Sequence, residues 1–110
     1  MTRALLVAAA LASLSLPMTA ATPSAATAEA RVTIDNFAFA PKNLTVKTGT
    51  TVIYDNADDT PHTVVAGNGA FRSPALDTGG KYAFTFTTSG VFAYYCSLHP
   101  HMQGMIVVEP

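Results

Sequence analysis

After residue 28 the sequence is built from short apolar stretches, and no segment carries a helical repeat of useful length. Residues 82–86 are the clearest stretch, because aromatic side chains there alternate with Ala and Thr, as in a strand with one buried face. Turn residues such as Gly79-Gly80 and Ser89-Gly90 recur about every eight to twelve residues. This pattern predicts an all-β domain of about seven or eight short strands, antiparallel, in a sandwich or a barrel.

Strands are expected where β-branched and aromatic residues cluster between turn signals. A change of parity at Asp35-Asn36 predicts a bulge or bend in the first strand. Pro74 makes a regular strand over residues 71–77 unfavourable. The expected strands are 31–39, 44–46, 50–54, 62–65, 82–86, 91–96 and 104–109.

The N-terminus has the layout of a secretory signal. A short start containing Arg3 is followed by an uncharged, Ala- and Leu-rich stretch at 4–16, and then by small residues. Cleavage is expected after Ala28, or after Ala30 as the alternative. A membrane anchor is the competing interpretation, but the apolar stretch is shorter than the roughly 20 residues that a span requires. We therefore predict a cleaved signal peptide at 1–28 and one exported, periplasmic domain at 29–110 without a membrane span.

Charge and cysteine content limit what the exported domain can do. Removing the signal leaves five basic and seven acidic side chains, a net charge of −2, which argues against a nucleic-acid partner. The single cysteine excludes an intrachain disulfide. A domain of 82 residues buries a modest core, so a bound metal is the remaining means of stabilising it.

The lone cysteine lies in a cluster of metal-binding residue types. Cys96, His99 and Met102 follow one another with two residues in each gap, in a loop between two expected strands. A thiolate, an imidazole and a thioether form a soft ligand set that favours copper. A copper site with two histidines, one cysteine and a weakly bound methionine needs one more imidazole.

Two histidines remain to supply that imidazole. His101 lies inside the loop, where three nearly consecutive residues would have to converge on one ion. His62 is distant in the sequence and can approach from a neighbouring strand. We therefore predict His62, Cys96, His99 and Met102 as the metal ligands. Met105 is the rival thioether, but its parity in the last strand turns it outward, and the role of His101 stays open.

Across the exported domain these segments resemble the cupredoxins, the small blue copper proteins of the plastocyanin and amicyanin group. Four segments carry the resemblance: Phe37 to Pro41, Leu44 to Gly49, Pro61 to Val64, and Gly90 to Met102. The short spacing of the ligand loop is closest to amicyanin. The resemblance implies a Greek-key β-sandwich that holds one copper ion, cycling between Cu(I) and Cu(II), through the four predicted ligands.

The chain departs from the family pattern at two positions beside the ligands. Thr63 stands where an Asn usually follows the first histidine, and we expect it to loosen the site or shift its potential. His101 stands where an apolar ring often precedes the axial methionine. These differences leave copper binding intact but put the choice of partner in doubt.

The expected function is electron transfer by a monomer in transient contact with redox proteins, such as a dehydrogenase or a c-type cytochrome. Leu98, Pro100 and Ala66 are candidates for a small apolar docking patch. The alternative function is a copper carrier that delivers the ion itself. An enzyme is disfavoured, because the loop offers no carboxylate to orient a base. The acidic residues Asp55, Asp58 and Asp59 are expected to form a solvated loop, or else a docking patch for a basic partner.

Overall fold

The structure is a computed structural model that describes residues 12–15, 17 and 28–110. The predicted signal peptide at 1–28 falls mostly outside the described residues, so the signal and its cleavage site remain predictions. Within the described ranges, no helix has the length and apolar character needed to cross a membrane.

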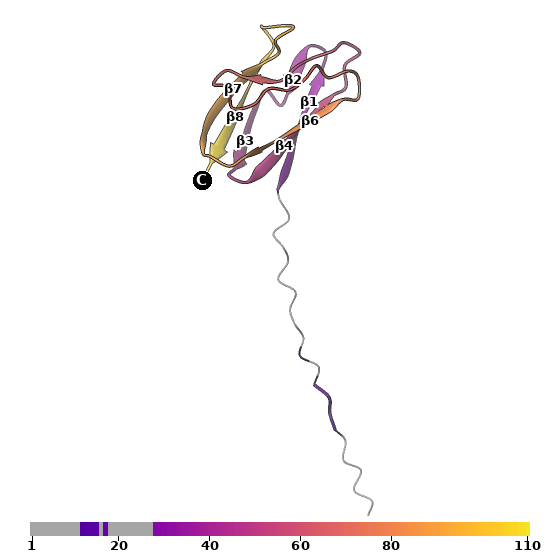
Figure 1. The fold of residues 1–110 in the computed structure, drawn as a ribbon, viewed down its shortest axis with the longest axis vertical. Helices are drawn as coiled ribbons and strands as arrows, with labels where there is room; N and C mark the ends of the chain where they lie inside the picture. The colour runs from indigo at the N-terminus through magenta and orange to yellow at the C-terminus, as the bar shows by residue number, and fades with distance from the viewer. Residues whose placement is uncertain (1–11, 16, 18–27) are drawn as a thin grey trace, which may run out of the picture.

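Eight strands form two four-stranded sheets that face each other in a sandwich (Figure 1). The first sheet has the order β2 (Ala38–Ala40), β1 (Glu29–Asp35), β4 (Thr50–Asn56) and β6 (Lys81–Phe86). The second has the order β3 (Asn43–Lys47), β8 (Gln103–Glu109), β7 (Gly90–Tyr95) and β5 (Val65–Ala66). The prediction of an all-β sandwich is confirmed.

The strand pairing is mixed rather than purely antiparallel. β1 pairs with β4, and β3 pairs with β8, in parallel, while the other pairs are antiparallel. The parallel pairs arise because the chain crosses between the sheets after β2, β3, β4, β5 and β6. Apolar periodicity reports which face of a strand is buried, and it does not report the direction of the neighbouring strand.

Alternating residues of both sheets fill the core. Val32 and Ile34 of β1 are fully buried, and Ile106 of β8 is buried on the facing sheet. Aromatic rings occupy the centre, where Tyr54 of β4 meets Tyr94 of β7 edge-on, with centroids 5.3 Å apart. Burial raises the pKa of both phenols. The core therefore joins the two sheets near the end of β7, two residues before Cys96.

The structure corrects two details of the predicted strands. The expected bulge near Asp35-Asn36 is instead the tight Asn36–Phe37 turn of the β1–β2 hairpin, in which Asp35 faces Ala38. The expected strand at 62–65 is shorter, because β5 covers only Val65–Ala66. His62 forms an isolated bridge with Leu76, exchanging hydrogen bonds of 3.1 and 2.7 Å with it, since Pro74 interrupts continuous pairing of these segments.

Gly104 offers a test of the packing beneath the loop. It lies opposite Tyr94 across the β7–β8 pair, and a Cβ at Gly104 would overlap the Tyr94 ring. We expect Gly104→Ala to lower the free energy of unfolding of the metal-free protein by about 1–3 kcal/mol, measured by urea denaturation. Gly67→Ala is the control, because its Cβ would lie 3.7 Å from the Ala93 carbonyl oxygen, an ordinary contact. Equal losses from both variants would contradict this packing.

Candidate metal centre

Three of the four predicted ligands come together at one end of the sandwich. His62 lies between β4 and β5, Cys96 directly follows β7, and His99 lies in the loop that leads to β8. Their ligand atoms all lie within 4.8 Å of one another. Each histidine presents its Nδ1 atom at 3.8 Å from the Cys96 sulfur. His62 and Cys96 are fully buried, whereas His99 is partly exposed.

Main-chain hydrogen bonds close the loop from Cys96 to Met102 on itself. The His99 N–H donates to the Cys96 carbonyl (3.2 Å), and the Met102 N–H donates to the His99 carbonyl (2.9 Å). The Cys96 N–H then donates to the Met102 carbonyl (3.1 Å), so the two ends of the loop lie side by side. These bonds bring the Met102 backbone beside Cys96, and the Met102 side chain is 3% exposed.

The two residues left open by the sequence have different surroundings. His101 is exposed. Met105 is 36% exposed on β8, as its outward parity predicts. The structure therefore favours Met102 over Met105 as the buried thioether.

Thr63 ties the segment around His62 to the Cys96 loop. Its N–H lies 3.4 Å and its hydroxyl 3.7 Å from the Cys96 sulfur. The Ser97 N–H donates to the same hydroxyl oxygen (2.8 Å), and the Ser97 hydroxyl lies 2.7 Å from it. One short side chain thus contacts both the sulfur and the residue after it. Thr63 therefore connects the two segments that carry the predicted ligands.

These contacts change the acidity of the thiol. Burial raises the pKa of Cys96, but the hydrogen bond from the Thr63 N–H, the contacts with the His99 and His62 imidazoles and the Thr63 hydroxyl together outweigh it and lower this pKa to about 6. The thiolate is the form that binds metals. The surroundings therefore favour the ligand form of Cys96 near neutral pH.

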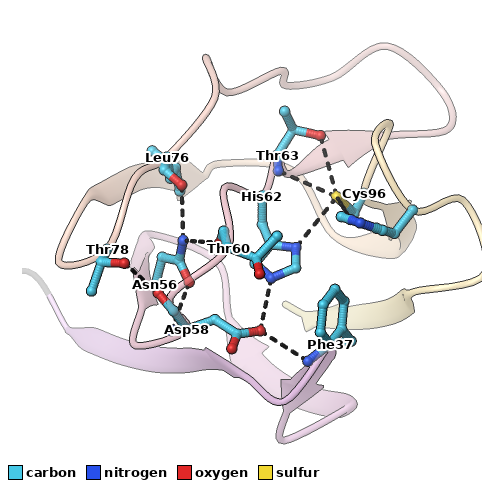
Figure 2. Close-up of polar contacts among 10 residues, drawn as sticks. Phe37, Asn56, Asp58, Thr60, His62, Thr63, Leu76, Thr78 and Cys96 are labelled. Atoms are coloured by element: carbon cyan, nitrogen blue, oxygen red, sulfur yellow. Dashed lines mark hydrogen bonds and ion pairs between the residues drawn. The ribbon is translucent and has the colours of Figure 1, made fainter.

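A buried carboxylate fixes the orientation of the His62 ring. His62 Nε2 lies 2.9 Å from Asp58 Oδ2, in a contact shielded from water (Figure 2). A carboxylate acceptor holds the proton on Nε2 and leaves the lone pair on Nδ1, the nitrogen that faces the sulfur. The Phe37 N–H donates to the same oxygen (3.0 Å). This bond, followed by the one to His62, lowers the pKa of Asp58.

Asp58 is itself held by its neighbours (Figure 2). Its N–H donates to Asn56 Oδ1 (2.9 Å), and its carbonyl accepts the Thr78 hydroxyl (2.6 Å). The Asn56 amide donates to the carbonyls of Thr60 (3.1 Å) and Leu76 (2.8 Å). The prediction of a solvated acidic loop is therefore wrong for Asp58, which is 7% exposed. The sequence signal that could have revealed this contact is the position of Asp58, four residues before His62.

Phe37 is the second residue that sequence reasoning missed at this site. Its ring meets the His62 ring at 5.4 Å and the His99 ring at 5.1 Å, both edge-to-face. The sequence placed Phe37 in a bulged strand, so nothing connected it with the histidines. The β1–β2 turn brings the Phe37 ring against both histidines.

The donor set fits copper. It combines one acidified thiol with two imidazoles whose Nδ1 atoms face that thiol, and a buried thioether lies on the same loop. Soft sulfur together with imidazole nitrogen is the combination that copper prefers in proteins. His62, Cys96 and His99, with Met102, form a candidate copper site.

Known proteins share both the sequence pattern and the fold. Two amicyanins, from Paracoccus versutus and Paracoccus denitrificans, are 34% and 36% identical over 83 residues, which is 71% of this chain and 63% of each amicyanin. A purple cupredoxin from Nitrosopumilus maritimus superposes with a TM-score of 0.69 at 35% identity, covering 73% of this chain and 99% of that one. The sequence profile of the Cupredoxin-like domain matches residues 4–108. The chain therefore belongs to the cupredoxin-like domain family.

Proposed function

We propose that this protein is a blue copper electron carrier, with His62, Cys96, His99 and Met102 as the ligands of one copper ion. The observation that carries the proposal is the convergence of two Nδ1 atoms on one buried sulfur. The similarity to amicyanins supports it. A periplasmic location after removal of residues 1–28 is part of the proposal, as is a monomeric state.

The bound copper ion would supply a one-electron couple between Cu(I) and Cu(II). The protein holds the ligands in place, because Asp58 fixes His62, Thr63 fixes the Cys96 sulfur, and the loop closes through main-chain bonds. Ligands fixed in this way move little when the charge on the ion changes. A small rearrangement is what rapid electron exchange requires.

Exposed apolar side chains around His99 support this face as the place where electrons enter or leave. Leu98 is 53% exposed and Phe37 is 45% exposed. Ala66, expected in the patch, is buried and does not contribute. A small patch suits brief encounters with a redox protein, such as a dehydrogenase or a c-type cytochrome, since turnover needs rapid release.

The burial of the ligands favours electron transfer over delivery of copper. His62, Cys96 and Met102 are each at most 3% exposed. A delivery protein needs ligands that an acceptor can reach, and among these four only His99 is partly open. Slow exchange of the ion is therefore the expected behaviour.

Cys96→Ser tests the central ligand. We expect the wild-type protein loaded with Cu(II) to be intensely blue, because charge transfer from the thiolate to Cu(II) absorbs visible light. Cys96→Ser should abolish this absorption, since a hydroxyl group cannot replace the thiolate. A colourless, weakly absorbing copper complex of the wild type would overturn the assignment.

Met102→Leu tests the thioether. We expect the variant to stay blue and to have a higher reduction potential, measured by voltammetry, because loss of a weak donor destabilises Cu(II) more than Cu(I). Met105→Leu is the matched control and should leave the potential unchanged, since Met105 lies on the outer face of β8. The reverse result would identify Met105 as the ligand.

Thr63→Val tests the contacts to the sulfur. Valine keeps the shape and the N–H of Thr63 but removes the hydroxyl that contacts Cys96 and Ser97. Donors to the sulfur weaken its donation to Cu(II), so the potential should fall by about 20–60 mV, the equivalent of one hydrogen bond in a one-electron couple. Thr63→Ser should retain the wild-type potential. Equal shifts in both variants would show that the hydroxyl has no such role.

A further inference from the structure

The turn between β1 and β2 carries a residue that its geometry disfavours. Asn36 and Phe37 are the two central residues of a two-residue hairpin, and both have positive φ angles, 50° and 55°. Such turns favour Asn followed by Gly, because a side chain at positive φ crowds its own backbone. Asn tolerates this conformation well, but a bulky aromatic residue does not. Asn36 follows the usual chemistry of the turn, and Phe37 breaks it.

The Phe37 ring is also poorly placed to stabilise the core. It is 45% exposed, so it gains less from burial than the core aromatics, which are nearly inaccessible. Neither turn geometry nor core packing therefore accounts for a phenylalanine here. Residues held in strained conformations of this kind cluster at functional sites.

The contacts of the ring identify that site. The Phe37 ring packs edge-to-face on both His62 and His99, and the two imidazoles lie 5.2 Å apart. Phe37 thus contacts the buried predicted ligand and the partly exposed one together, from the β1–β2 turn of the first sheet. His99 belongs to the loop that leads into the second sheet.

One carboxylate oxygen contacts both the Phe37 backbone and the His62 ring. Asp58 Oδ2 accepts the Phe37 N–H at 3.0 Å and contacts His62 Nε2 at 2.9 Å. The bond to the N–H anchors the backbone of the strained turn. The bond to His62 fixes the ring against which Phe37 packs. The position of the Phe37 ring is therefore linked to that of His62 through a single acceptor.

We propose that Phe37 is a positioning residue for the metal centre, whose ring closes over both histidines and restrains His99 in its ligand position. This role rests on the proposed function. His99 is the predicted ligand with partial exposure, and its own hydrogen bonds are to the loop and to Cys96. Phe37 supplies packing against this ring from outside the loop. The turn is less stable with Phe37 than with glycine, but Phe37 keeps an aromatic ring against His99.

The test compares three substitutions in the same turn. Phe37→Gly removes the ring and relieves the strain, whereas Asn36→Gly changes the other positive-φ position without removing the ring. Phe37→Tyr keeps an aromatic ring. For each protein we would measure the visible spectrum with Cu(II), the urea midpoint of the metal-free form, and the rate at which the reduced protein loses copper to excess bathocuproine disulfonate.

We expect Phe37→Gly to raise the urea midpoint and to release copper about tenfold faster or more, since loss of a residue that supports a ligand typically lowers metal affinity by about 10- to 100-fold. Asn36→Gly should release copper at the wild-type rate, as should Phe37→Tyr. Release from Phe37→Gly at the wild-type rate would overturn the role of Phe37. Faster release with a lowered urea midpoint would also overturn it, because the ring would then act through general packing.

The same measurements separate this inference from the proposed function. A wild-type protein without the blue absorption would overturn both. A blue wild type whose Phe37→Gly variant is equally blue and equally slow to release copper would overturn only the positioning role. Faster release from Asn36→Gly as well would assign the effect to the turn rather than to the ring.

Discussion

The bond between His62 and Asp58 determines which imidazole nitrogen faces the Cys96 sulfur. With the proton held on Nε2 by the carboxylate, Nδ1 presents a lone pair toward the thiol. The half of the site around His62 is organised by the neighbours of this carboxylate. Asn56 and Thr78 hold Asp58, and Phe37 donates its N–H to the same carboxylate. A polar network between the β1–β2 turn and the segment after β4 thus fixes His62, which faces the sulfur that follows β7.

The second half of the site depends on a different kind of constraint. Cys96, His99 and Met102 lie on one short loop whose ends are joined by a main-chain hydrogen bond. Its position follows from β7 and β8, which pair directly on either side of it. Thr63 is the link between the halves, since it contacts Cys96 and Ser97 across the gap. Local sequence dictates the loop, and tertiary structure dictates its distance from His62.

The predictable part of this protein lies in its local patterns. Alternation in stretches such as 82–86 identified strands, and the spacing of Cys96, His99 and Met102 predicted the loop that carries three of the candidate ligands. The two parallel pairings were not predictable, because periodicity is the same for either direction. Phe37 was missed because its residue type contradicts the turn that contains it. Asp58 was misjudged because its burial depends on a hairpin more than twenty residues earlier in the chain.

The parallel pairing of β3 with β8 has a consequence for how the protein folds. It joins residues 43–47 to residues 105–109, near the C-terminal end of the chain. Long loops must close before such contacts form, and topologies rich in them fold slowly. β8 also completes the loop that holds Cys96, so the predicted ligands converge only when the last strand has docked. Until β8 docks, the Cys96 thiol is therefore unprotected, and a metal ion that needs all four predicted ligands would bind only after the sandwich has closed.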